Sequence, residues 1–418
     1  MPSTALRVGI IALCTACYVS VSASEAATIS ATSCSSSAVQ AAIDSAQNGD
    51  TVLVPSGSCT WSSGVSISGK AIHLQGEAAG TVTLTHGAGS ATLIAITEAS
   101  AGRVEVSNLT LLRGSGSGRL IMVNNASNGR AVLIHDNTMG PNSIRLETNR
   151  GVIYRNTLNG AGLGSSGIQC KPIGLTSSWT TASTMGTADV SGESNVYVED
   201  NTFTNFWTEV ADSDDNCRIV FRYNTFVDSG ITSHGPDTSA EGTRHWEVYN
   251  NTFRYSGDGG CNETLNKNVP YFFYIRGGTG IIADNVMPNL NSCAWGNKPE
   301  IIMTVQNLRR NAGPYACWKT YPAPRQVGQS RSGSAAVTDP VYLWGNTGGG
   351  NYGSPAINDY SPNECGSGAP SSSAFITNGR DYVVGVKPGY QKYPYPHPLR
   401  GGSQTIKLPS APTNVRVQ

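Results

Sequence analysis

The chain has 418 residues, of which 13% are charged, and its 28 Lys and Arg residues balance 28 Asp and Glu residues. A formal net charge of zero excludes a whole-molecule field that would attract nucleic acid or a membrane surface. The 48 glycines and 39% hydrophobic residues indicate a turn-rich, folded, all-β protein rather than a disordered one.

The first 26 residues resemble a secretory signal. Arg7 precedes the apolar run from Val8 to Val21, and the small residues of SASEAA follow it. The run is too short for a membrane span, and no later stretch is apolar enough to cross a bilayer. We therefore expect a secreted, extracellular protein with no membrane span.

Eight cysteines follow the signal, an even number in a compartment that permits oxidation. The sequence leaves the pairing open, but neighbours in chain order would each clamp a loop or an end. A zinc site built on these cysteines is disfavoured because CxxC or matching His spacing is absent. The eight are Cys34, Cys59, Cys170, Cys217, Cys261, Cys293, Cys317 and Cys365.

A short amphipathic helix is expected at the start of the mature chain. Ser35 to Ser37 can cap it, Val39 and Ile43 lie on its apolar face, and Asn48-Gly49 would end it. The strand and turn of DTVLVPSGSCTW come next. Because a solenoid exposes its apolar core at the first coil, we predict that this helix is a lid.

Seven later segments share one register around an asparagine, which indicates a repeat. The residues three before and two after the asparagine are almost all apolar, and they include Phe203, Phe226 and Phe253. The asparagines are Asn137, Asn156, Asn201, Asn224, Asn251, Asn285 and Asn346. The residues two before five of them are His135, Tyr154, Glu199, Arg222 and Tyr249, which we expect to point to solvent.

The asparagine has a physical role at the corner of each coil. Its side chain tolerates left-handed backbone angles, and its amide both donates and accepts hydrogen bonds. Stacked amides can therefore bond to the corner backbone and to one another, forming a ladder inside the turn. Phe203, Phe226 and Phe253 should then form a single internal stack.

The capping helix, the GDTVLVPSG segment leading to Trp61 and the stacked strands with an asparagine ladder resemble the pectate lyase-like superfamily. The resemblance covers roughly residues 30 to 350. It implies an all-β, right-handed parallel β-helix with a short N-terminal capping helix, as one domain over residues 27–400. Residues 401–418 resemble a linker or remnant. The superfamily includes lyases, hydrolases, esterases, tailspikes and adhesins, so the fold does not choose an activity.

Two later segments depart from the repeat. Residues 289–339 are locally basic and irregular. The proline-rich KYPYPHPLRGG tail is predicted to lie extended along the barrel as a clasp.

A candidate site follows from the stacking of coils, which puts outward side chains into columns about 4.8 Å apart. The segments GIQCK, WTEVAD, GITSHG and FYIRGG would place Lys171, Asp212, His234 and Arg276 in or near one column. The polar segment from residue 231 to 247 contributes further candidates. They are Arg244 and, for substrate binding, Asp237, His245 and Glu247.

Asp212, Asp214 and Asp215 form the densest acidic group and could hold Ca²⁺ through oxygen ligands. In the superfamily that the chain resembles, calcium commonly bridges an acidic sugar to the protein. The alternative is a polar loop beside Cys217.

Three functions compete. A lyase needs a base next to a uronate and a cation for the developing enolate. His234 is favoured as acid/base by its ordinary pKa near neutrality, with Lys171, Arg244 and Arg276 neutralising charge. A glycoside hydrolase needs carboxylates astride the bond. A glycan-binding adhesin would use tryptophans, although these are more often packed. We favour a lyase acting on an acidic, uronate-containing polysaccharide.

Overall fold

The structure is a computed structural model. It describes residues 25–87, 89–161, 166–172, 179, 183–206, 209–236, 240–254, 271–287, 300–332, 335–348, 352–359 and 363–401. The expected signal and the segment from 402 to 418 lie outside these residues.

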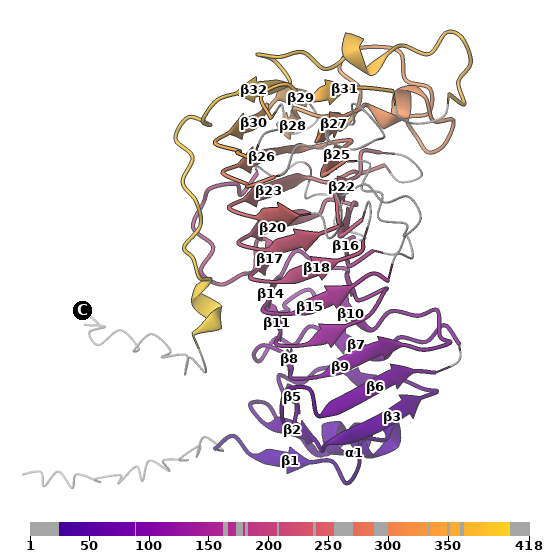
Figure 1. The fold of residues 1–418 in the computed structure, drawn as a ribbon, viewed down its shortest axis with the longest axis vertical. Helices are drawn as coiled ribbons and strands as arrows, with labels where there is room; N and C mark the ends of the chain where they lie inside the picture. The colour runs from indigo at the N-terminus through magenta and orange to yellow at the C-terminus, as the bar shows by residue number, and fades with distance from the viewer. Residues whose placement is uncertain are drawn as a thin grey trace, which may run out of the picture.

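The described chain winds through three parallel sheets in turn, and most coils add one strand to each sheet (Figure 1). Sheet A contains β1 (Thr28–Ser30), β2 (Thr51–Val54), β5 (His73–Gly76), β8 (Glu105–Ser107), β11 (Val132–His135), β14 (Gly151–Tyr154), β17 (Val196–Glu199), β20 (Arg218–Arg222), β23 (His245–Tyr249), β26 (Thr279–Ala283), β30 (Val341–Trp344) and β32 (Tyr382–Val384).

Sheet B contains β3 (Gly57–Trp61), β6 (Val82–His86), β9 (Thr110–Arg113), β12 (Thr138–Met139), β15 (Thr157–Asn159), β18 (Thr202–Thr204), β21 (Thr225–Val227) and β24 (Thr252–Arg254). Sheet C contains β4 (Val65–Ile67), β7 (Ile94–Thr97), β10 (Ile121–Asn124), β13 (Ile144–Leu146), β16 (Ile168–Cys170), β19 (Ala211–Ser213), β22 (Ile231–Ser233), β25 (Phe273–Ile275), β27 (Ile301–Met303) and β31 (Ala356–Ile357). The predicted right-handed parallel β-helix is confirmed.

Few described elements lie outside these sheets. β28 (Gln329–Ser332) and β29 (Ala335–Thr338) pair as an antiparallel hairpin. The helical elements are α1 (Ser36–Ser45) and the 3₁₀ turns η5 (Gln306–Leu308), η6 (Ser372–Ala374) and η7 (Pro398–Arg400).

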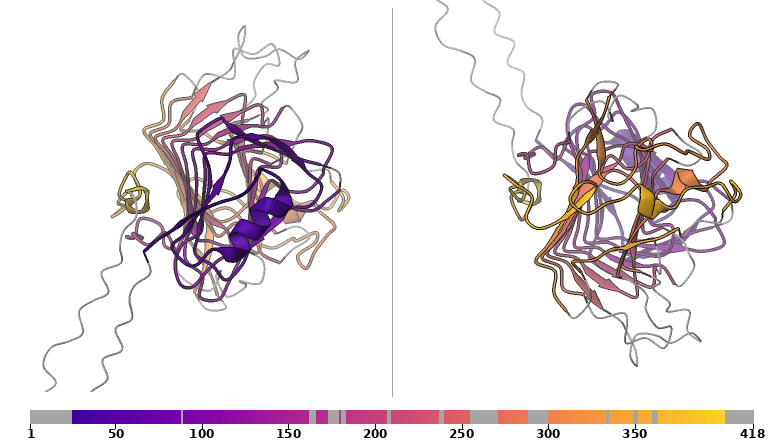
Figure 2. Two further views of the ribbon diagram at one scale, coloured as in Figure 1. Left: turned by 90° about the horizontal axis from the view of Figure 1, so that it is seen from below. Right: turned by 90° about the horizontal axis from the view of Figure 1, so that it is seen from above.

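The helix α1 covers the first coil, as Figure 2 shows from below. Ser35 is its N-cap, and the Ser35 side chain accepts a hydrogen bond from the Ala38 backbone N–H. Val39 and Ile43 are buried against the core. The helix ends at Ser45, earlier than the expected Asn48-Gly49 stop. The predicted lid is confirmed.

The asparagine ladder runs through all seven repeat positions. At Asn201, Oδ1 accepts from the backbone N–H of Asn156 at 2.9 Å and from its Nδ2 at 3.0 Å. Asn201 Nδ2 in turn donates to Asn224 Oδ1 at 3.0 Å. The same pairing recurs from Asn137 to Asn346. The corner backbone is thereby satisfied inside the protein.

One detail of the corners differs from the prediction. The left-handed residue is the one before each asparagine, with φ of 55° at Asp136, 56° at Asp200 and 58° at Tyr223. The asparagines themselves act through their side-chain amides, which must point inward to form hydrogen bonds with the next coil.

Apolar stacking forms the core along the axis. The ring centroids of Phe203 and Phe226 lie 5.2 Å apart, and those of Phe226 and Phe253 lie 4.6 Å apart, in stacked pairs. This confirms the single internal stack.

Disulfides join Cys34 to Cys59, Cys170 to Cys217, and Cys317 to Cys365. Each pair consists of neighbours in chain order, as the sequence suggested. Cys261 and Cys293 lie outside the described residues.

The expectation that the residues two before each asparagine meet solvent is wrong. His135, Tyr154, Glu199, Arg222 and Tyr249 point away from the core, yet all five are buried. The C-terminal segment explains this for four of them, because it runs down the outer face of sheet A in Figure 1 and contacts them, whereas His135 stacks on the Tyr154 ring.

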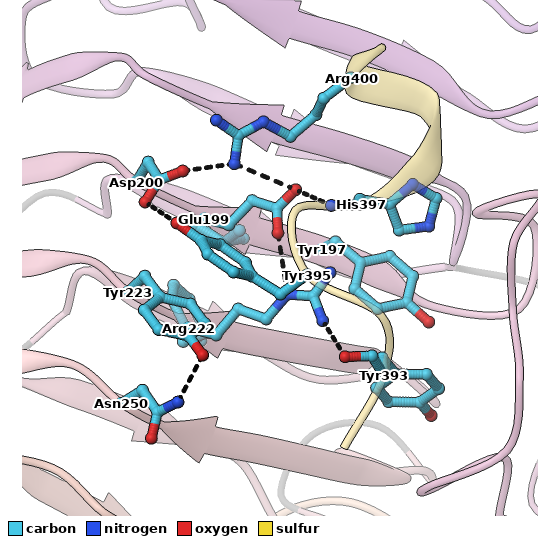
Figure 3. Close-up of polar contacts among 12 residues, drawn as sticks. Tyr197, Glu199, Asp200, Arg222, Tyr223, Asn250, Tyr393, Tyr395, His397 and Arg400 are labelled. Atoms are coloured by element: carbon cyan, nitrogen blue, oxygen red, sulfur yellow. Dashed lines mark hydrogen bonds and ion pairs between the residues drawn. The ribbon is translucent and has the colours of Figure 1, made fainter. Parts of the chain in front are cut away.

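The tail makes specific contacts with sheet A (Figure 3). Arg222 Nη1 donates to the Tyr393 carbonyl at 3.0 Å, and the His397 N–H donates to Glu199 Oε1 at 3.0 Å. The rings of Tyr223 and Tyr395 stack with centroids 3.6 Å apart. The predicted clasp is thus seen in the contacts of residues 390–400.

Candidate functional site

The outer face of sheet C carries polar side chains at the ends of four successive strands. Cys170 pairs with Ser213, Ser213 with Ser233, and Ser233 with Ile275. The residues that follow these four strand ends are Lys171, Asp214, His234 and Arg276. The predicted column therefore forms, except that Asp214 stands where Asp212 was expected. Asp212 lies two residues earlier on the same outward side of β19.

Lys171 and His234 converge on the Asp212 carboxylate. Lys171 Nζ lies 3.3 Å from Asp212 Oδ2 and 3.6 Å from Asp214 Oδ2, and His234 Nε2 lies 3.0 Å from Asp212 Oδ1. The side chains of Lys171 and His234 are 20% and 14% exposed, whereas those of Asp212 and Asp214 are 9% and 7% exposed. We call these four residues the sheet C cluster. Its carboxylates form the floor, and its two basic side chains are partly exposed, although the Nδ1 atom of His234 is itself buried.

The two carboxyl groups have opposite protonation tendencies. Burial opposes ionisation of Asp212, but the hydrogen bond with His234 and the charges of His234 and Lys171 outweigh it and hold the Asp212 pKa far below its usual range. Burial raises the pKa of Asp214 to about 6, and the neighbouring Asp215 adds to this rise. Burial also raises the pKa of Glu209, with the Asp212 charge as a further cause.

Further polar groups extend the cluster along the sheet. Gln169 Nε2 donates to Asp212 Oδ2 at 2.6 Å, and Gln169 Oε1 accepts from Arg119 at 3.0 Å and Arg145 at 3.1 Å. Arg276 donates to the Ser233 carbonyl at 3.1 Å. The sequence analysis missed Gln169, Arg119, Arg145 and Glu209. Extending the outward column backward to IRL and IQC would have found Arg145 and Gln169, which are register partners.

Three other candidates lie away from this cluster. Arg244 is fully buried, with its guanidinium 5.3 Å from the Trp179 ring and Nη2 donating to Ser330 Oγ at 2.7 Å. His245 and Glu247 lie on β23 of sheet A and are also fully buried.

Burial disfavours the charged forms of both His245 and Glu247. Burial lowers the pKa of His245 well below its ordinary value. Burial raises the Glu247 pKa to about 7, although the Tyr390 hydroxyl donates a hydrogen bond to Oε2 at 2.5 Å. Neither side chain reaches the sheet C face. Asp237 lies outside the described residues.

The expected calcium ligands do not form a metal-binding group among the described residues. Lys171 already faces both Asp212 and Asp214, and the Asp215 backbone N–H donates to Asp214 Oδ1. A calcium ion would have to displace an ammonium group from the same oxygens. The only convergent set of three metal-binding side chains in the described part of the chain lies on sheet A.

Two of the tryptophans that could have stacked on a sugar ring are not available for it. Trp179 and Trp246 are buried. Among the described residues, no helix has the length and apolar character that a membrane crossing requires.

Comparison with known proteins shows likeness in structure but none in sequence. No family model matches the chain, and no curated protein matches it either. An alginate lyase from Paenibacillus sp. str. FPU-7 is 17% identical with a TM-score of 0.37, covering 62% of this chain and 95% of that one. The PL6 family polysaccharide lyase Pedsa3628 from Pseudopedobacter saltans is 14% identical with a TM-score of 0.37, covering 77% of each chain.

The PL6 family alginate lyase AlyGC is 14% identical with a TM-score of 0.36. The match covers 88% of this chain and 53% of the AlyGC chain, so this chain spans about half the length of AlyGC.

Proposed function

We propose that this protein is a secreted polysaccharide lyase that cleaves a uronate-containing polymer by β-elimination at the sheet C cluster. The observation that carries the proposal is the convergence of Lys171 and His234 on the Asp212 carboxylate. One basic imidazole and one ammonium group thus share a partly exposed face. Those are the two groups that proton abstraction beside a carboxylate requires.

The proposed elimination needs no group beyond His234, Asp212, Lys171 and the substrate. His234 takes the proton from the carbon next to the uronate carboxylate, and the released electron pair forms a carbon–carbon double bond. The glycosidic carbon–oxygen bond on the neighbouring carbon breaks, and the leaving oxygen takes the proton back from the imidazolium. Asp212 holds the imidazole at 3.0 Å and stabilises its charged form. Lys171 neutralises the negative charge that develops on the substrate carboxylate.

The surroundings suit an acidic polymer. Arg276 follows β25, one coil beyond His234, and Arg145 lies on β13 on the other side. Guanidinium groups bind carboxylates in a bidentate manner, so the partly exposed Arg145 offers a chain laid along sheet C a cation, whereas Arg276 is only 9% exposed and donates to the Ser233 carbonyl. Arg244 has no part in the proposal, because its guanidinium is buried beside Trp179. No step uses calcium.

A glycoside hydrolase of the same fold is the second candidate, and one observation favours it. Asp212 is ionised, whereas burial raises the pKa of Asp214 to about 6. A carboxylate and a carboxylic acid with separated pKa values are the groups that glycosidic hydrolysis uses. In that reaction Asp214 would protonate the leaving oxygen.

One assay separates these functions. The purified protein is incubated with alginate, polygalacturonate and a neutral glucan, and both ultraviolet absorbance and new reducing ends are followed. Elimination leaves a double bond conjugated with the carboxylate, so a lyase gives both signals, whereas a hydrolase gives reducing ends alone. Retention of the polymer without either signal would indicate a glycan-binding protein and overturn the proposal.

Variants identify the site within the same assay. His234→Gln and Lys171→Met should each abolish most of the absorbance increase. Arg130→Ala is the matched control, because Arg130 is an exposed residue whose 3.1 Å ion pair with Glu193 lies away from the cluster. Equal activity in all three variants would place the reaction elsewhere.

The proposal of secretion rests on residues 1–26 together with the three disulfides, which form in oxidising compartments. Expression with residues 1–26 intact should deliver the protein to the medium with a shortened N-terminus. Retention in the cell at full length would contradict it.

A further inference from the structure

A second group of chemically active side chains lies on sheet A, in its N-terminal half. His73, Glu105 and His135 come from β5, β8 and β11, which are three successive rungs. His73 is the register partner of Glu105, and His135 is the partner of Ser107. The two histidines, 62 residues apart in sequence by their numbers, thus lie on either side of one carboxylate.

The ligand atoms of these residues point toward one another. Glu105 Oε1 lies 2.6 Å from His135 Nε2 and 3.8 Å from His73 Nε2, and all three atoms lie within 4.8 Å of one another. Adjacent ligands of a tetrahedral ion bound at about 2.0–2.1 Å are themselves roughly 3.3 Å apart. Small side-chain rotations would bring the three atoms to that spacing.

Supporting contacts hold the His135 ring in place. His135 Nδ1 lies 2.6 Å from Asp136 Oδ2, and Arg155 Nε donates to Asp136 Oδ1 at 2.8 Å. The Tyr154 ring stacks on the imidazole with centroids 4.5 Å apart. A carboxylate on the outer nitrogen of an imidazole is the usual support for a metal-binding histidine, because it fixes the tautomer and raises the basicity of the ligand nitrogen.

We propose that His73, Glu105 and His135 bind a divalent transition-metal ion of the zinc type, with a fourth position left for water. The side chains of His73, Glu105 and His135 are 23%, 31% and 10% exposed, so an ion can enter from solvent. The Ser107 hydroxyl, 2.7 Å from His73 Nε2, lies beside the ion.

The ligand chemistry selects the metal. Two imidazoles and one carboxylate match zinc and its neighbours, whereas calcium and magnesium take oxygen ligands almost exclusively.

This site is separate from the sheet C cluster, because its three strands belong to sheet A and the cluster residues adjoin strands of sheet C. It would tie three coils together near the N-terminal end of the solenoid. Arg400, at the end of the clasp, lies over the Tyr154 ring at 4.8 Å, so the bound ion would lie one aromatic ring away from the tail.

The competing interpretation needs no metal. A protonated His135 placed between Glu105 and Asp136 would form a closed ion-pair group with both ring nitrogens satisfied. The two interpretations differ in whether the protein takes up zinc and in which substitutions prevent it.

Titration of metal-free protein with Zn²⁺, followed by calorimetry and by the shift of the thermal unfolding midpoint, tests the proposal. We expect one zinc ion per chain at this site and a raised midpoint. His73→Ala and His135→Ala should abolish both effects, and Glu105→Gln should weaken binding. Asp136→Asn keeps all three ligands, and asparagine tolerates the left-handed φ of 55° at this position. The loss of the carboxylate beside His135 Nδ1 should weaken zinc binding roughly 10- to 100-fold.

The matched control is His234→Ala, which removes a histidine from the other face and should leave this zinc binding intact. Circular dichroism of each variant shows whether it is folded. No zinc uptake by the folded native protein would overturn the proposal, as would uptake that survives His135→Ala. Stabilisation by Ca²⁺ but not Zn²⁺ would overturn the choice of metal.

Discussion

The outer faces of sheets A and C are built by the same coils, yet their charged side chains differ in exposure where the C-terminal tail crosses sheet A. On sheet A, Glu199 and Arg222 are 0% exposed and form a 2.8 Å ion pair beneath the tail. On sheet C, Lys171 and His234 retain 20% and 14% exposure. Both sets point away from the core. The difference teaches that an outward polar side chain on a β-helix is structural when a distant segment covers it and is available for chemistry only when nothing does.

The surroundings of the charges differ in the same way. Under the tail, Arg222 donates through Nε to Glu199 and through Nη1 to the Tyr249 hydroxyl and the Tyr393 carbonyl, while its buried Nη2 has no hydrogen-bond partner among the described residues. In the sheet C cluster, the side chains of Lys171 and His234 share the Asp212 carboxylate and remain partly exposed. Four predictions test this contrast, and the one with the greatest expected change comes first.

The strongest test compares a histidine from each face. His234→Ala should lower kcat/KM roughly 10²- to 10⁴-fold, because it removes the proposed acid/base. His397→Gln, in the tail, should leave kcat/KM within about twofold and lower only the unfolding midpoint, since His397 is buried against sheet A. Steady-state kinetics on the most active uronate polymer measure both. Equal loss of activity in the two variants would remove the distinction between the faces.

Arginines give the second test. Arg222→Ala should lower the free energy of unfolding by about 3–5 kcal/mol, because it leaves Glu199 buried without its main partner. Arg145→Ala on sheet C breaks the partly exposed 2.8 Å pair with Glu147 and should lower it by no more than about 1 kcal/mol. Urea denaturation gives both values. Similar losses would mean that the cover on sheet A has little energetic effect.

A defect in the shared ladder should affect both faces together. Asn201→Ala leaves the buried Asn156 N–H without its partner, at roughly 1–3 kcal/mol for such a group, and also removes the bond to Asn224. Asn346→Ala, at the last and only partly buried rung, should be milder. Hydrogen exchange at the amides of both neighbouring sheets provides the measurement. Protection lost on sheet A alone would contradict a common scaffold.

The smallest effect concerns pH. Burial raises the Glu247 pKa to about 7, above an unfolded value of about 4.3. The folded state therefore binds the extra proton, and the stability it contributes is full below about pH 4 and declines as pH rises through about 7. Glu247→Gln removes this decline, so native protein should lose stability relative to the variant between pH 5 and 8. Parallel stability curves over that window would show that Glu247 is ionised in the folded protein.

The sequence foretold the scaffold in detail but the site only in outline. The ladder, the phenylalanine stack and the capping helix followed from local patterns that repeat every coil. The column of Lys171, His234 and Arg276 also followed from the repeat. The sequence could not show that Asp214, rather than Asp212, would occupy the column position between Lys171 and His234. The expected end of β19 was uncertain by two residues, and only its pairing with β16 and β22 fixes the position of that end.

His245, Glu247 and Arg244 show the other limit of sequence reasoning. They stand in one polar segment with His234, although the asparagine repeat places Tyr249, two residues after Glu247, on the strand before Asn251 and so on a different strand from His234. Thr243 N–H donates to the His234 carbonyl at 2.8 Å, after which β23 begins on the other face. Proximity in sequence therefore did not become proximity in space.

The repeat by itself determined which side chains point inward and which point outward, because alternation along a strand is a property of the local backbone. Only the tertiary structure decided which outward side chains meet water. His397 covers Glu199 from 198 residues further along the chain. The burial of a charge depends on whatever segment is packed over it, and no local pattern around Glu199 or Lys171 contains that information.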